Sequence, residues 1–586
     1  MYLIFLLMLI AGLAEGVGIL MLLPLLQNFD VGSSSSGSLP SEQTELSGIT
    51  LFVHDILAVL NLPGSTVALL LIITVAFLLK GGLTFCALGY SAYLRGQLLR
   101  ELKGRLLDAY SRMSYGYYAT RDTGYFINLI NEQTTRALQS FYHLTLLGAQ
   151  IIYAIIYLAL AYVVAWRFGL MATFVGLVIL ALFRWLNVRV RALSRMTAQE
   201  NGNLAKLLIQ ILQAFKYLTA TSQTPHLRKS VASSINRLTE YQIRTSIAAA
   251  FTKSANEPIA VVLVMLVVMI QIVYLEQPLA PILVSILLFH RGIQAVLALQ
   301  GTWQSTLEFI GSIELVHTEF AQQKKNQEKT GSYHLPTLRY GIRLENIFFR
   351  YDPQSDDVIE GLNLEIPVRT SVALIGQSGA GKSTVGDLIT LMLKPQKGQI
   401  VIDGVPGQDV DLTSWRNQIG YVSQETVVFD DSIANNICLW RGDPSRDPKL
   451  MKRVREAAQR AHLDYYIETL ADGYQTLVGD RGLRLSGGQR QRLFIARELF
   501  RKPNLLILDE ATSALDSESE RAIQQSIDEL KGKITVIIIA HRLSTIRNVD
   551  IVCVLDNGRL VEQGGYQALR DADDTRFAKL VAMQTL

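Results

Sequence analysis

Six long apolar stretches fill the first half of the chain and constrain its fold more than any other feature. A helix needs about 20 apolar residues to cross the hydrocarbon core of a bilayer. Because the backbone finds no water there, each stretch is expected to be helical. The sequence therefore predicts an all-α transmembrane domain with six spans, at approximately 3–27, 66–94, 142–165, 168–188, 256–275 and 279–300.

Charge in the connections predicts the orientation of these spans. The loop 28–65 carries acidic residues and no Lys or Arg, whereas the connections after the second and fourth spans are both rich in Lys and Arg. Basic connections stay on the cytoplasmic side of a membrane. We therefore expect the 28–65 loop outside and the C-terminal half in the cytoplasm. A cleaved signal peptide over 1–27 is the alternative for the first span, but that segment lacks a basic start and contains Glu15.

The second half of the chain reads as a soluble α/β protein. A polar, unpatterned linker is expected at 322–335, between a membrane domain at 1–321 and a soluble domain at 336–586. The net charge of +4 is small for 586 residues, so no nucleic-acid partner is predicted. The cysteines Cys86, Cys438 and Cys553 follow no metal-ligand spacing and are expected to be reduced thiols.

The second half of the chain contains a phosphate-binding motif. Gly376–Ser383 fits G-x-x-x-x-G-K-[ST], after an expected strand at Ser371–Ile375 and before an expected helix at Thr384–Leu393. Backbone N–H groups of such a loop wrap phosphates, its Lys reaches the β- and γ-phosphate oxygens, and its Ser binds Mg²⁺. The predicted nucleotide ligands are Gly376, Gln377, Ser378, Gly379, Ala380, Gly381, Lys382, Ser383 and Thr384.

Two carboxylates, Asp509 and Glu510, end a second expected apolar strand, Leu505–Glu510. Asp509 is expected to hold Mg²⁺ through water, and Glu510 to polarise the attacking water. An isolated acidic pair also fits a solvated strand end, but the phosphate-binding loop favours the catalytic interpretation. The soluble domain is thus predicted to be an α/β P-loop NTPase.

The run Leu485-Ser-Gly-Gly-Gln489, before an expected helix at Arg490–Phe500, together with the phosphate-binding loop resembles the ATP-binding cassette transporter family. The resemblance covers the whole chain, most strongly the second half. It implies an exporter-type membrane domain, a cassette with a helical signature subdomain, and ATP and Mg²⁺ as cofactors. By resemblance, Ser486, Gly487, Gly488 and Gln489 cap the γ-phosphate held by another subunit.

Other family positions are also filled in this sequence. By resemblance, Tyr351 stacks on adenine, Gln424 contacts Mg²⁺ and water, His541 contacts the γ-phosphate, and Asp516 lies in the loop that crosses a dimer. Asp480 stands where the family usually has Glu. Because one cassette supplies only half of each composite site, the chain is expected to pair with a second copy of itself, and a heterodimer remains the alternative.

Two cytoplasmic segments resemble the coupling segments of exporters. They are Tyr117–Gly124 and Gln213–Tyr217, and each is expected to dock on a cassette. The alternative for both is an ordinary turn between cytoplasmic helices.

Charges at mid-depth of the expected spans hint at the cargo. A charge at the bilayer centre costs about 2.5–3.5 kcal/mol on insertion scales, so such residues tend to be functional. They are Glu15, Lys80, His290 and Arg291. Glu15 and Lys80 are expected to pair, leaving Arg291 unmatched. One hypothesis is that a cationic patch accepts a lipid phosphate or pyrophosphate, and the other is that these charges lock helices together.

The membrane half also resembles bacterial lipid-linked oligosaccharide flippases. The shared features are Glu15, a following apolar run that ends Leu-Pro-Leu-Leu, Lys80 in the second span, and an expected outer helix in the 28–65 loop. We therefore expect ATP-driven export or flipping of an amphipathic substrate, a lipid or lipid-linked saccharide with an anionic head group, across the bacterial cytoplasmic membrane by alternating access. Membrane lipid is an expected partner. Export of peptides or hydrophobic drugs, and an ATP-gated channel or regulator, remain alternatives.

Overall fold

The computed structural model describes residues 1–22, 25, 66–164, 166–274, 279–352, 354–424, 427–509, 517–540, 542–572 and 575–585. The chain divides into two compact units. Unit 1 comprises Met1–Met113 and Tyr118–Gln327, and unit 2 comprises Ser114–Tyr117 and Glu328–Leu586. The second division falls within the expected linker, although a helix continues to Lys325.

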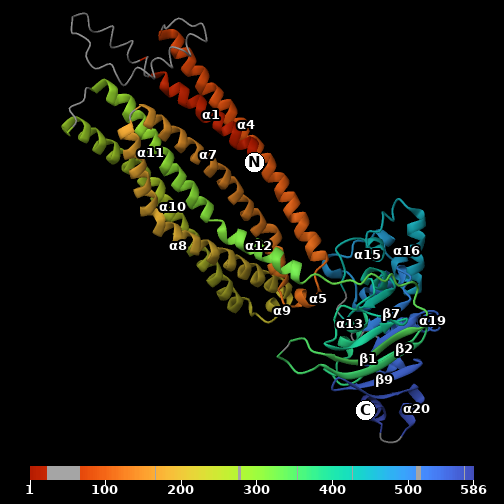
Figure 1. The fold of residues 1–586 in the computed structure, drawn as a ribbon. Coiled ribbons are helices and arrows are strands. Elements are labelled where there is room, and N and C mark those ends of the chain that lie inside the picture. Colours follow the sequence, from red (N-terminus) through yellow and green to blue (C-terminus); the bar gives the residue numbers. More distant parts are fainter. Residues whose placement is uncertain are drawn as a thin grey trace, which may run out of the picture. The chain divides into compact units, whose positions relative to one another are not determined.

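Unit 1 is built from long helices (Figure 1). The longest contains 51 residues, which at 1.5 Å per residue is about 75 Å and well over twice the hydrocarbon thickness of a bilayer. The long helices of unit 1 thus extend well beyond the parts that would cross the hydrocarbon core. The helices are α1 (Tyr2–Leu20), α4 (Thr66–Ser111), α5 (Tyr115–Ala119), α6 (Thr123–Asn128), the π-helical η1 (Leu129–Gln133), α7 (Thr134–Val164), α8 (Trp166–Gln213), α9 (Phe215–Ala220), α10 (Thr224–Tyr274), α11 (Leu279–Leu307) and α12 (Ile310–Lys325).

Five helices in the described part of the chain are long and apolar enough to cross a membrane. They match the first five expected spans. The sixth expected span, 279–300, lies on α11, and the count of six is not confirmed. The expected outer loop 28–65 and the turn at 276–278 lie outside the described residues.

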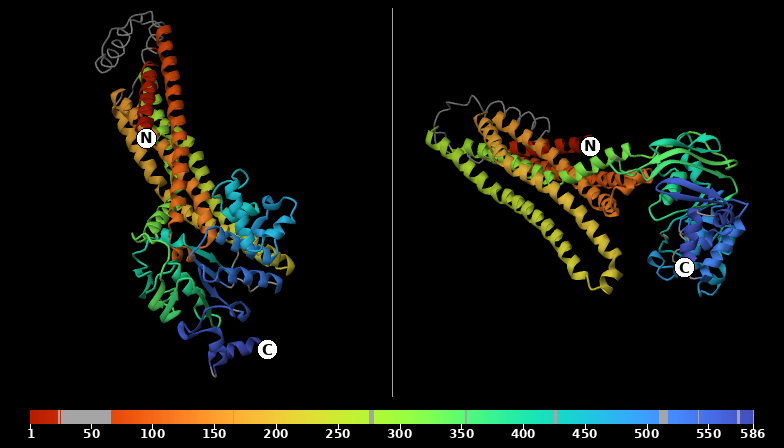
Figure 2. Two further views of the ribbon diagram at one scale, coloured as in Figure 1. Left: turned by 90° about the vertical axis from the view of Figure 1, so that its right-hand side faces the viewer. Right: turned by 90° about the horizontal axis from the view of Figure 1, so that it is seen from below.

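Small residues allow α1 to approach its neighbours closely. A Cβ at Gly12 would lie 2.5 Å from Cδ1 of Ile156 on α7, and one at Gly18 would lie 3.2 Å from Cε2 of Phe77 on α4. Close approach through small residues is how membrane helices gain van der Waals contact, since lipid supplies no hydrophobic drive between them. On the other side of the unit, α8 and α10 run side by side and are joined through α9 (Figure 2).

A break separates α11 from α12 and is filled by a side chain of α8. The Ser194 hydroxyl donates to the Glu308 carbonyl at 2.6 Å and accepts from the Gly311 N–H at 3.0 Å. On the far side, the Ser312 hydroxyl donates to the side-chain oxygen of Gln133 at 2.8 Å. Helix ends carry backbone groups that need partners, so these contacts fix the break in place.

Unit 2 contains two β-sheets with helices around them (Figure 1). The four-stranded sheet is antiparallel in the order β2-β1-β4-β5, and the six-stranded sheet has the order β10-β9-β3-β8-β7-β6. The strands are β1 (Gly341–Phe349), β2 (Ile359–Pro367), β3 (Ser371–Ile375), β4 (Lys397–Ile402), β5 (Val405–Pro406), β6 (Ile419–Val422), β7 (Leu505–Asp509), β8 (Thr535–Ile539), β9 (Ile551–Asp556) and β10 (Arg559–Gly564). The helices of at least five residues are α13 (Lys382–Ile389), α14 (Leu412–Arg416), α15 (Ile433–Cys438), α16 (Pro448–Arg460), α17 (Asp464–Glu468), α18 (Gly487–Phe500), α19 (Ser517–Leu530), α20 (Tyr566–Asp571) and α21 (Arg576–Thr585).

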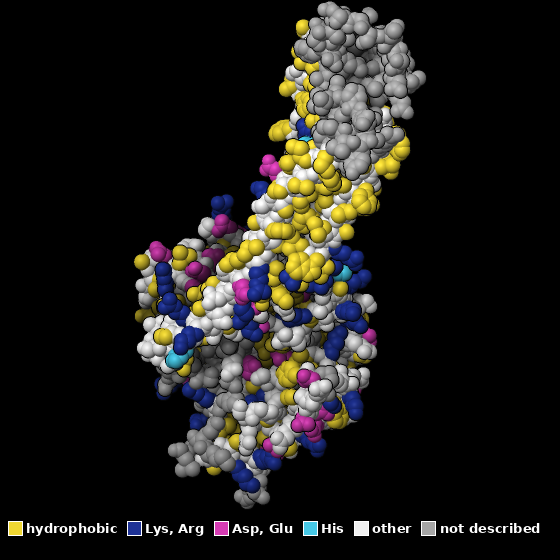
Figure 3. Space-filling model, turned by 90° about the vertical axis from the view of Figure 1, so that its left-hand side faces the viewer, with side chains coloured by type: hydrophobic (Ala, Val, Ile, Leu, Met, Phe, Trp, Pro, Cys, Tyr) yellow, Lys and Arg dark blue, Asp and Glu magenta, His cyan; other side chains and the backbone are white. Residues whose placement is uncertain are grey.

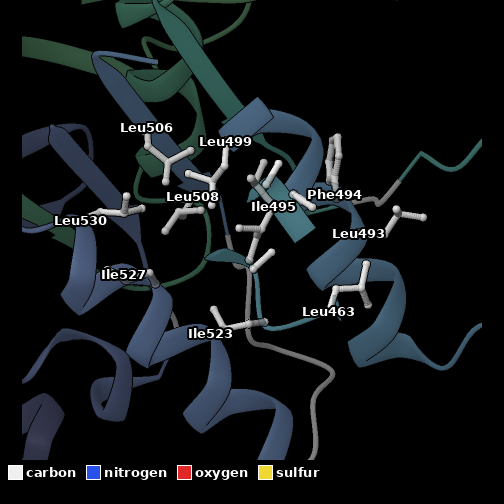
Figure 4. Close-up of a cluster of buried hydrophobic side chains, with 14 of the residues drawn as sticks. Leu463, Leu493, Phe494, Ile495, Leu499, Leu506, Leu508, Ile523, Ile527 and Leu530 are labelled. Carbon is white, nitrogen blue, oxygen red and sulfur yellow. The ribbon is translucent and has the colours of Figure 1, made fainter. Parts of the chain in front are cut away.

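Two apolar cores hold unit 2 together. One lies between the two sheets and includes the fully buried Trp415. The other packs α18 and α19 against β7 through Leu499, Leu506 and Ile523 (Figure 4). The buried strands β3, β7 and β8 are continuous apolar runs, as expected for parallel strands covered on both faces. These cores give the loops at the strand ends a rigid base.

Candidate functional site

The carboxyl ends of four neighbouring parallel strands form the site in unit 2. β3, β8, β7 and β6 lie side by side in that order and run parallel. The phosphate-binding loop follows β3, Asp509 ends β7, and Gln424 lies two residues beyond the end of β6. Ligands of α/β proteins bind at this edge of the sheet. Glu510, His541 and Asp516 fall outside the described residues.

Glycine is required at three positions of the phosphate-binding loop. Gly376, Gly379 and Gly381 have φ values of 155°, 85° and 91°, which L side chains rarely adopt. A Cβ at Gly376 would also lie 2.2 Å from the Leu555 carbonyl oxygen. The loop thus folds back on the sheet and turns into α13. That helix spans Lys382–Ile389 rather than the expected Thr384–Leu393, because Leu391 adopts a left-handed conformation with φ of 57°.

Lys382 and Ser383 begin α13 beside Asp509. The Lys382 ammonium is buried and donates to the carbonyls of Gly376 and Gln377 at 3.0 and 2.8 Å, so it lies inside the loop. The Ser383 hydroxyl donates to Asp509 Oδ1 at 3.3 Å. A hydroxyl and a carboxylate oxygen are hard donors, which suit Mg²⁺. The residues present therefore fit a magnesium nucleotide.

Asp387 and Tyr421 belong to this site and were not singled out by the sequence patterns. The Tyr421 hydroxyl donates to Asp387 Oδ1 at 3.3 Å. Burial, opposed by that hydrogen bond and reinforced by the charge of Asp509, raises the pKa of Asp387 to about 6. Asp387 follows Ser383 by four residues, so both lie on one helix face. That spacing is the signal that points to Asp387.

Tyr351 presents a largely free aromatic ring at the edge of the same region. Its side chain is 59% exposed, and its hydroxyl lies 3.0 Å from Thr384 Oγ1. Phe349 meets the ring edge-on, with centroids 5.0 Å apart. An exposed ring fixed at one end is suited to stacking on a nucleotide base.

The signature run Ser486–Gln489 forms the start of α18. The Ser486 hydroxyl accepts from the Gln489 N–H at 3.2 Å, and the Gln489 side-chain oxygen accepts from the Ser486 N–H at 2.8 Å. This capping box starts the helix at Gly487, three residues before the expected Arg490. Ser486 is exposed, and the helix N-terminus behind it favours an anion.

A buried guanidinium holds α18 in place. Arg497 donates to the Val427 carbonyl and the Asn436 carbonyl, at 2.7 and 2.8 Å. Its guanidinium also lies over the rings of Phe429 and Phe494, 5.2 Å from each centroid. Burial lowers the pKa of Arg497 to about 10, which leaves it charged at neutral pH. The signature helix and the segment after Gln424 are therefore tied together.

A second charged cluster lies in unit 1, among α1, α4 and α11. Glu15 is fully buried. Its Oε2 lies 2.5 Å from Lys80 Nζ, and its Oε1 lies 3.6 Å from Arg291 Nη1. The predicted pairing of Glu15 with Lys80 is confirmed. The prediction that Arg291 is unmatched is wrong, because α11 brings Arg291 to the other oxygen of the same carboxylate. His290, the fourth predicted residue, is partly buried beside Arg291 in the sequence.

The two expected coupling segments are short helices between long ones. In the first, expected at Tyr117–Gly124, α5 spans Tyr115–Ala119 and α6 begins at Thr123; Tyr117 belongs to unit 2, and the residues from Tyr118 onward belong to unit 1. In the second, α8 ends at Gln213 and α9 follows at Phe215. Phe215 and Tyr217 of this segment are 62% and 65% exposed.

Comparison with known proteins agrees with both halves of the structure. Residues 1–297 match the ABC transporter transmembrane region and residues 359–513 match the ABC transporter domain. A heterocyst differentiation ATP-binding protein, HepA, from Nostoc sp. is 33% identical over 80% of this chain and 77% of its own. An ATP-dependent lipid A-core flippase from Haemophilus influenzae is 30% identical over 86% of each.

Among solved structures, a bacterial Atm1-family ABC exporter with ATP bound has the same fold. Its TM-score is 0.79 at 24% sequence identity, over 99% of this chain and 98% of that one. The fold thus agrees with that of a solved exporter, and both halves of the chain match family models. The chain belongs to the ABC transporter family, as a membrane exporter whose ATPase cassette drives transport.

Proposed function

We propose that this exporter moves a lipid or lipid-linked saccharide with an anionic head group across the bacterial cytoplasmic membrane. The observation that carries the proposal is the pair of cations, Lys80 and Arg291, whose side chains remain 28% and 44% exposed within the membrane helices. Glu15 offsets only one of these two charges, and an uncompensated positive charge within a membrane span is costly unless it meets an anion. The similarity to the ATP-dependent lipid A-core flippase from Haemophilus influenzae supports the same cargo class.

The cassette residues take the following roles in the proposal. Lys382 and the N–H groups of Gly376–Thr384 bind the nucleotide phosphates, and Tyr351 stacks on the base. Ser383, Gln424 and Asp509 hold Mg²⁺, which supplies positive charge at the β- and γ-phosphate oxygens when bound. Glu510 orients and polarises the attacking water, and His541 contacts the γ-phosphate.

Two copies of the chain complete each nucleotide site. Ser486–Gln489 of the second copy caps the γ-phosphate with backbone N–H groups at the start of α18, and Asp516 lies at the same boundary. ATP thus binds across two cassettes and favours their closed arrangement, and hydrolysis removes the γ-phosphate contacts that hold it. Nucleotide then biases a two-state membrane domain between inward and outward access. The exposed Phe215 and Tyr217 and the segment Ser114–Tyr117 are the proposed links between cassette and membrane helices.

The test is lipid-stimulated ATPase activity of the purified full chain in phosphatidylcholine vesicles. A polyprenyl diphosphate-linked sugar is added as the probe, with an uncharged polyprenol as its comparison. We expect only the diphosphate to stimulate hydrolysis, and the double substitution Lys80→Met and Arg291→Met to abolish stimulation while basal hydrolysis continues.

A matched control removes the same charge from exposed positions on α8 and α10, through Arg184→Met and Lys253→Met. This control is expected to keep the stimulation. Equal stimulation by the uncharged polyprenol, or full stimulation of the Lys80 and Arg291 double variant, would refute an anionic cargo. Stimulation by a peptide or an uncharged hydrophobic drug alone would favour the alternative cargo class.

A further inference from the structure

The carboxylate of Glu15 lies behind the two cations that the proposed cargo would meet. The Glu15 side chain is 1% exposed, against 28% for Lys80 and 44% for Arg291. A ligand in the membrane domain can therefore reach both cations but not the carboxylate. The cluster has one negative and two positive charges, and only the positive charges have an open side.

Glu15 is also held firmly in place. It lies on α1 between Gly12 and Gly16, and a Cβ at these glycines would lie 2.5 and 3.1 Å from Ile156 and Leu160 of α7. The Lys80 ammonium lies 5.9 Å from the centroid of the Tyr153 ring, also on α7. Because α1 is packed this closely, the carboxylate stays beside the cations when an anion arrives.

We propose that Glu15 is a built-in counter-charge that limits how tightly Lys80 and Arg291 hold the anionic head group, so that the cargo is released after it has crossed. This inference rests on the proposed function. Two unopposed cations would attract a phosphate strongly where the dielectric constant is low. A carboxylate at 2.5 and 3.6 Å offsets part of that attraction, leaving the cluster with one net positive charge. Glu15 thus sets the balance between capture and release.

A purely structural lock predicts a different result when the charge is removed. If Glu15 only holds Lys80 and Arg291 together, Glu15→Gln lets the two cations separate and weakens cargo binding. If Glu15 is a counter-charge, the same substitution strengthens cargo binding and slows turnover. The two interpretations therefore predict opposite changes in the strength of cargo binding.

The experiment measures ATPase activity of the full chain in phosphatidylcholine vesicles against the amount of the polyprenyl diphosphate-linked sugar. For Glu15→Gln we expect the half-stimulating amount to fall about tenfold and the maximal stimulated rate to fall as well, with the KM for ATP unchanged. Glu257→Gln, at an exposed position on α10, is the matched control and should behave as wild type. Glu15→Asp withdraws the carboxylate without removing it, and should shift the half-stimulating amount in the same direction by less.

The outcomes separate the two proposals. An unchanged or larger half-stimulating amount in both Glu15 variants overturns the counter-charge, even when stimulation still depends on Lys80 and Arg291. Absence of stimulation in the wild type, or stimulation that survives the loss of both cations, overturns the anionic cargo and with it the counter-charge. If Glu15→Gln does not fold, the Glu15→Asp shift decides by its sign.

Discussion

The two units bury their functional charges in different ways. In the cassette, the Lys382 ammonium is held by carbonyls five and six residues earlier in the same loop. In the membrane unit, Glu15 meets partners at positions 80 and 291, on two other helices. On the face shown in the space-filling view, hydrophobic side chains gather along the long helices, whereas charged side chains are mixed with other groups in the lower part of the picture (Figure 3). Local geometry is encoded in a short motif, while the membrane cluster depends on how whole helices pack.

Removal of the Lys382 ammonium tests the role of the phosphate-binding loop, and it has the largest expected effect. We predict that Lys382→Met lowers the ATPase rate by about 10²–10³-fold, because a positioned donor to developing phosphate charge is lost. The rate is measured by phosphate release from purified protein. Lys394→Met, at an exposed cassette position, is the control and should retain activity. A Lys382→Met rate near wild type would mean that the loop does not act as described.

Shortening one buried side chain of the cassette core tests how much the packing of that core stabilises the cassette. Leu506 on β7 is fully buried between helices and neighbouring strands. We predict that Leu506→Ala lowers the free energy of unfolding by about 2–5 kcal/mol, the usual cost of a large-to-small change in a core. Chemical denaturation monitored by circular dichroism, with nucleotide absent, gives this value. A change below about 1 kcal/mol would contradict the described core.

Replacement of a glycine by a larger residue tests the packing of the membrane unit, again through its effect on stability. Gly12→Val places branched carbons where Ile156 and Tyr153 already lie. We predict a loss of about 1–3 kcal/mol from overpacking, together with loss of lipid-stimulated ATPase, since α1 carries Glu15. Thermal unfolding in detergent checks the first effect. Gly104→Val, on α4 where no neighbouring atom lies within 4 Å, is the control, and an equal loss there would point to helix propensity rather than packing.

The smallest predicted effect concerns Asp387 and depends on pH. Its pKa in the folded protein is raised to about 6 by burial, so the folded state binds more protons than the unfolded state between pH 4 and 6. Ionisation of Asp387 therefore lowers stability as pH rises through this range. We predict that Asp387→Asn stabilises the nucleotide-free protein by about 1 kcal/mol at pH 7.5, discounted for partial exposure.

This gain should disappear near pH 4, which melting curves across pH can show. A gain that is constant with pH would mean that the charge of Asp387 is not its cause.

Local motifs explain why much of the cassette could be predicted. The strand at Ser371–Ile375 has the predicted bounds, and the second strand begins at the predicted Leu505 and is described as far as Asp509. Each is a buried apolar run that ends in a polar motif. The residues at which helices begin and end were less predictable. The capping box at Ser486 and the left-handed Leu391 are single-residue backbone events that a periodic pattern does not reveal.

The membrane cluster shows where sequence reasoning ends. The cost of burying charge was enough to single out Glu15, Lys80 and Arg291, and opposite sign was enough to pair the first two. Whether Arg291 reaches the same carboxylate depends on the rotation of α11 relative to α1, which helix packing sets and the sequence pattern does not reveal. The sequence patterns did not single out Asp387, because it lies on α13 whereas its partner Tyr421 lies on β6, far away in the sequence.

The most direct measurement follows a head-group-labelled anionic lipid across the bilayer of proteoliposomes containing the full chain. The account predicts that Mg-ATP changes the fraction of label accessible to an added quencher in wild-type vesicles. The change should be absent with Lys382→Met and with the Lys80→Met and Arg291→Met double variant. Translocation that proceeds equally without ATP, or that persists when both membrane cations are gone, would contradict it.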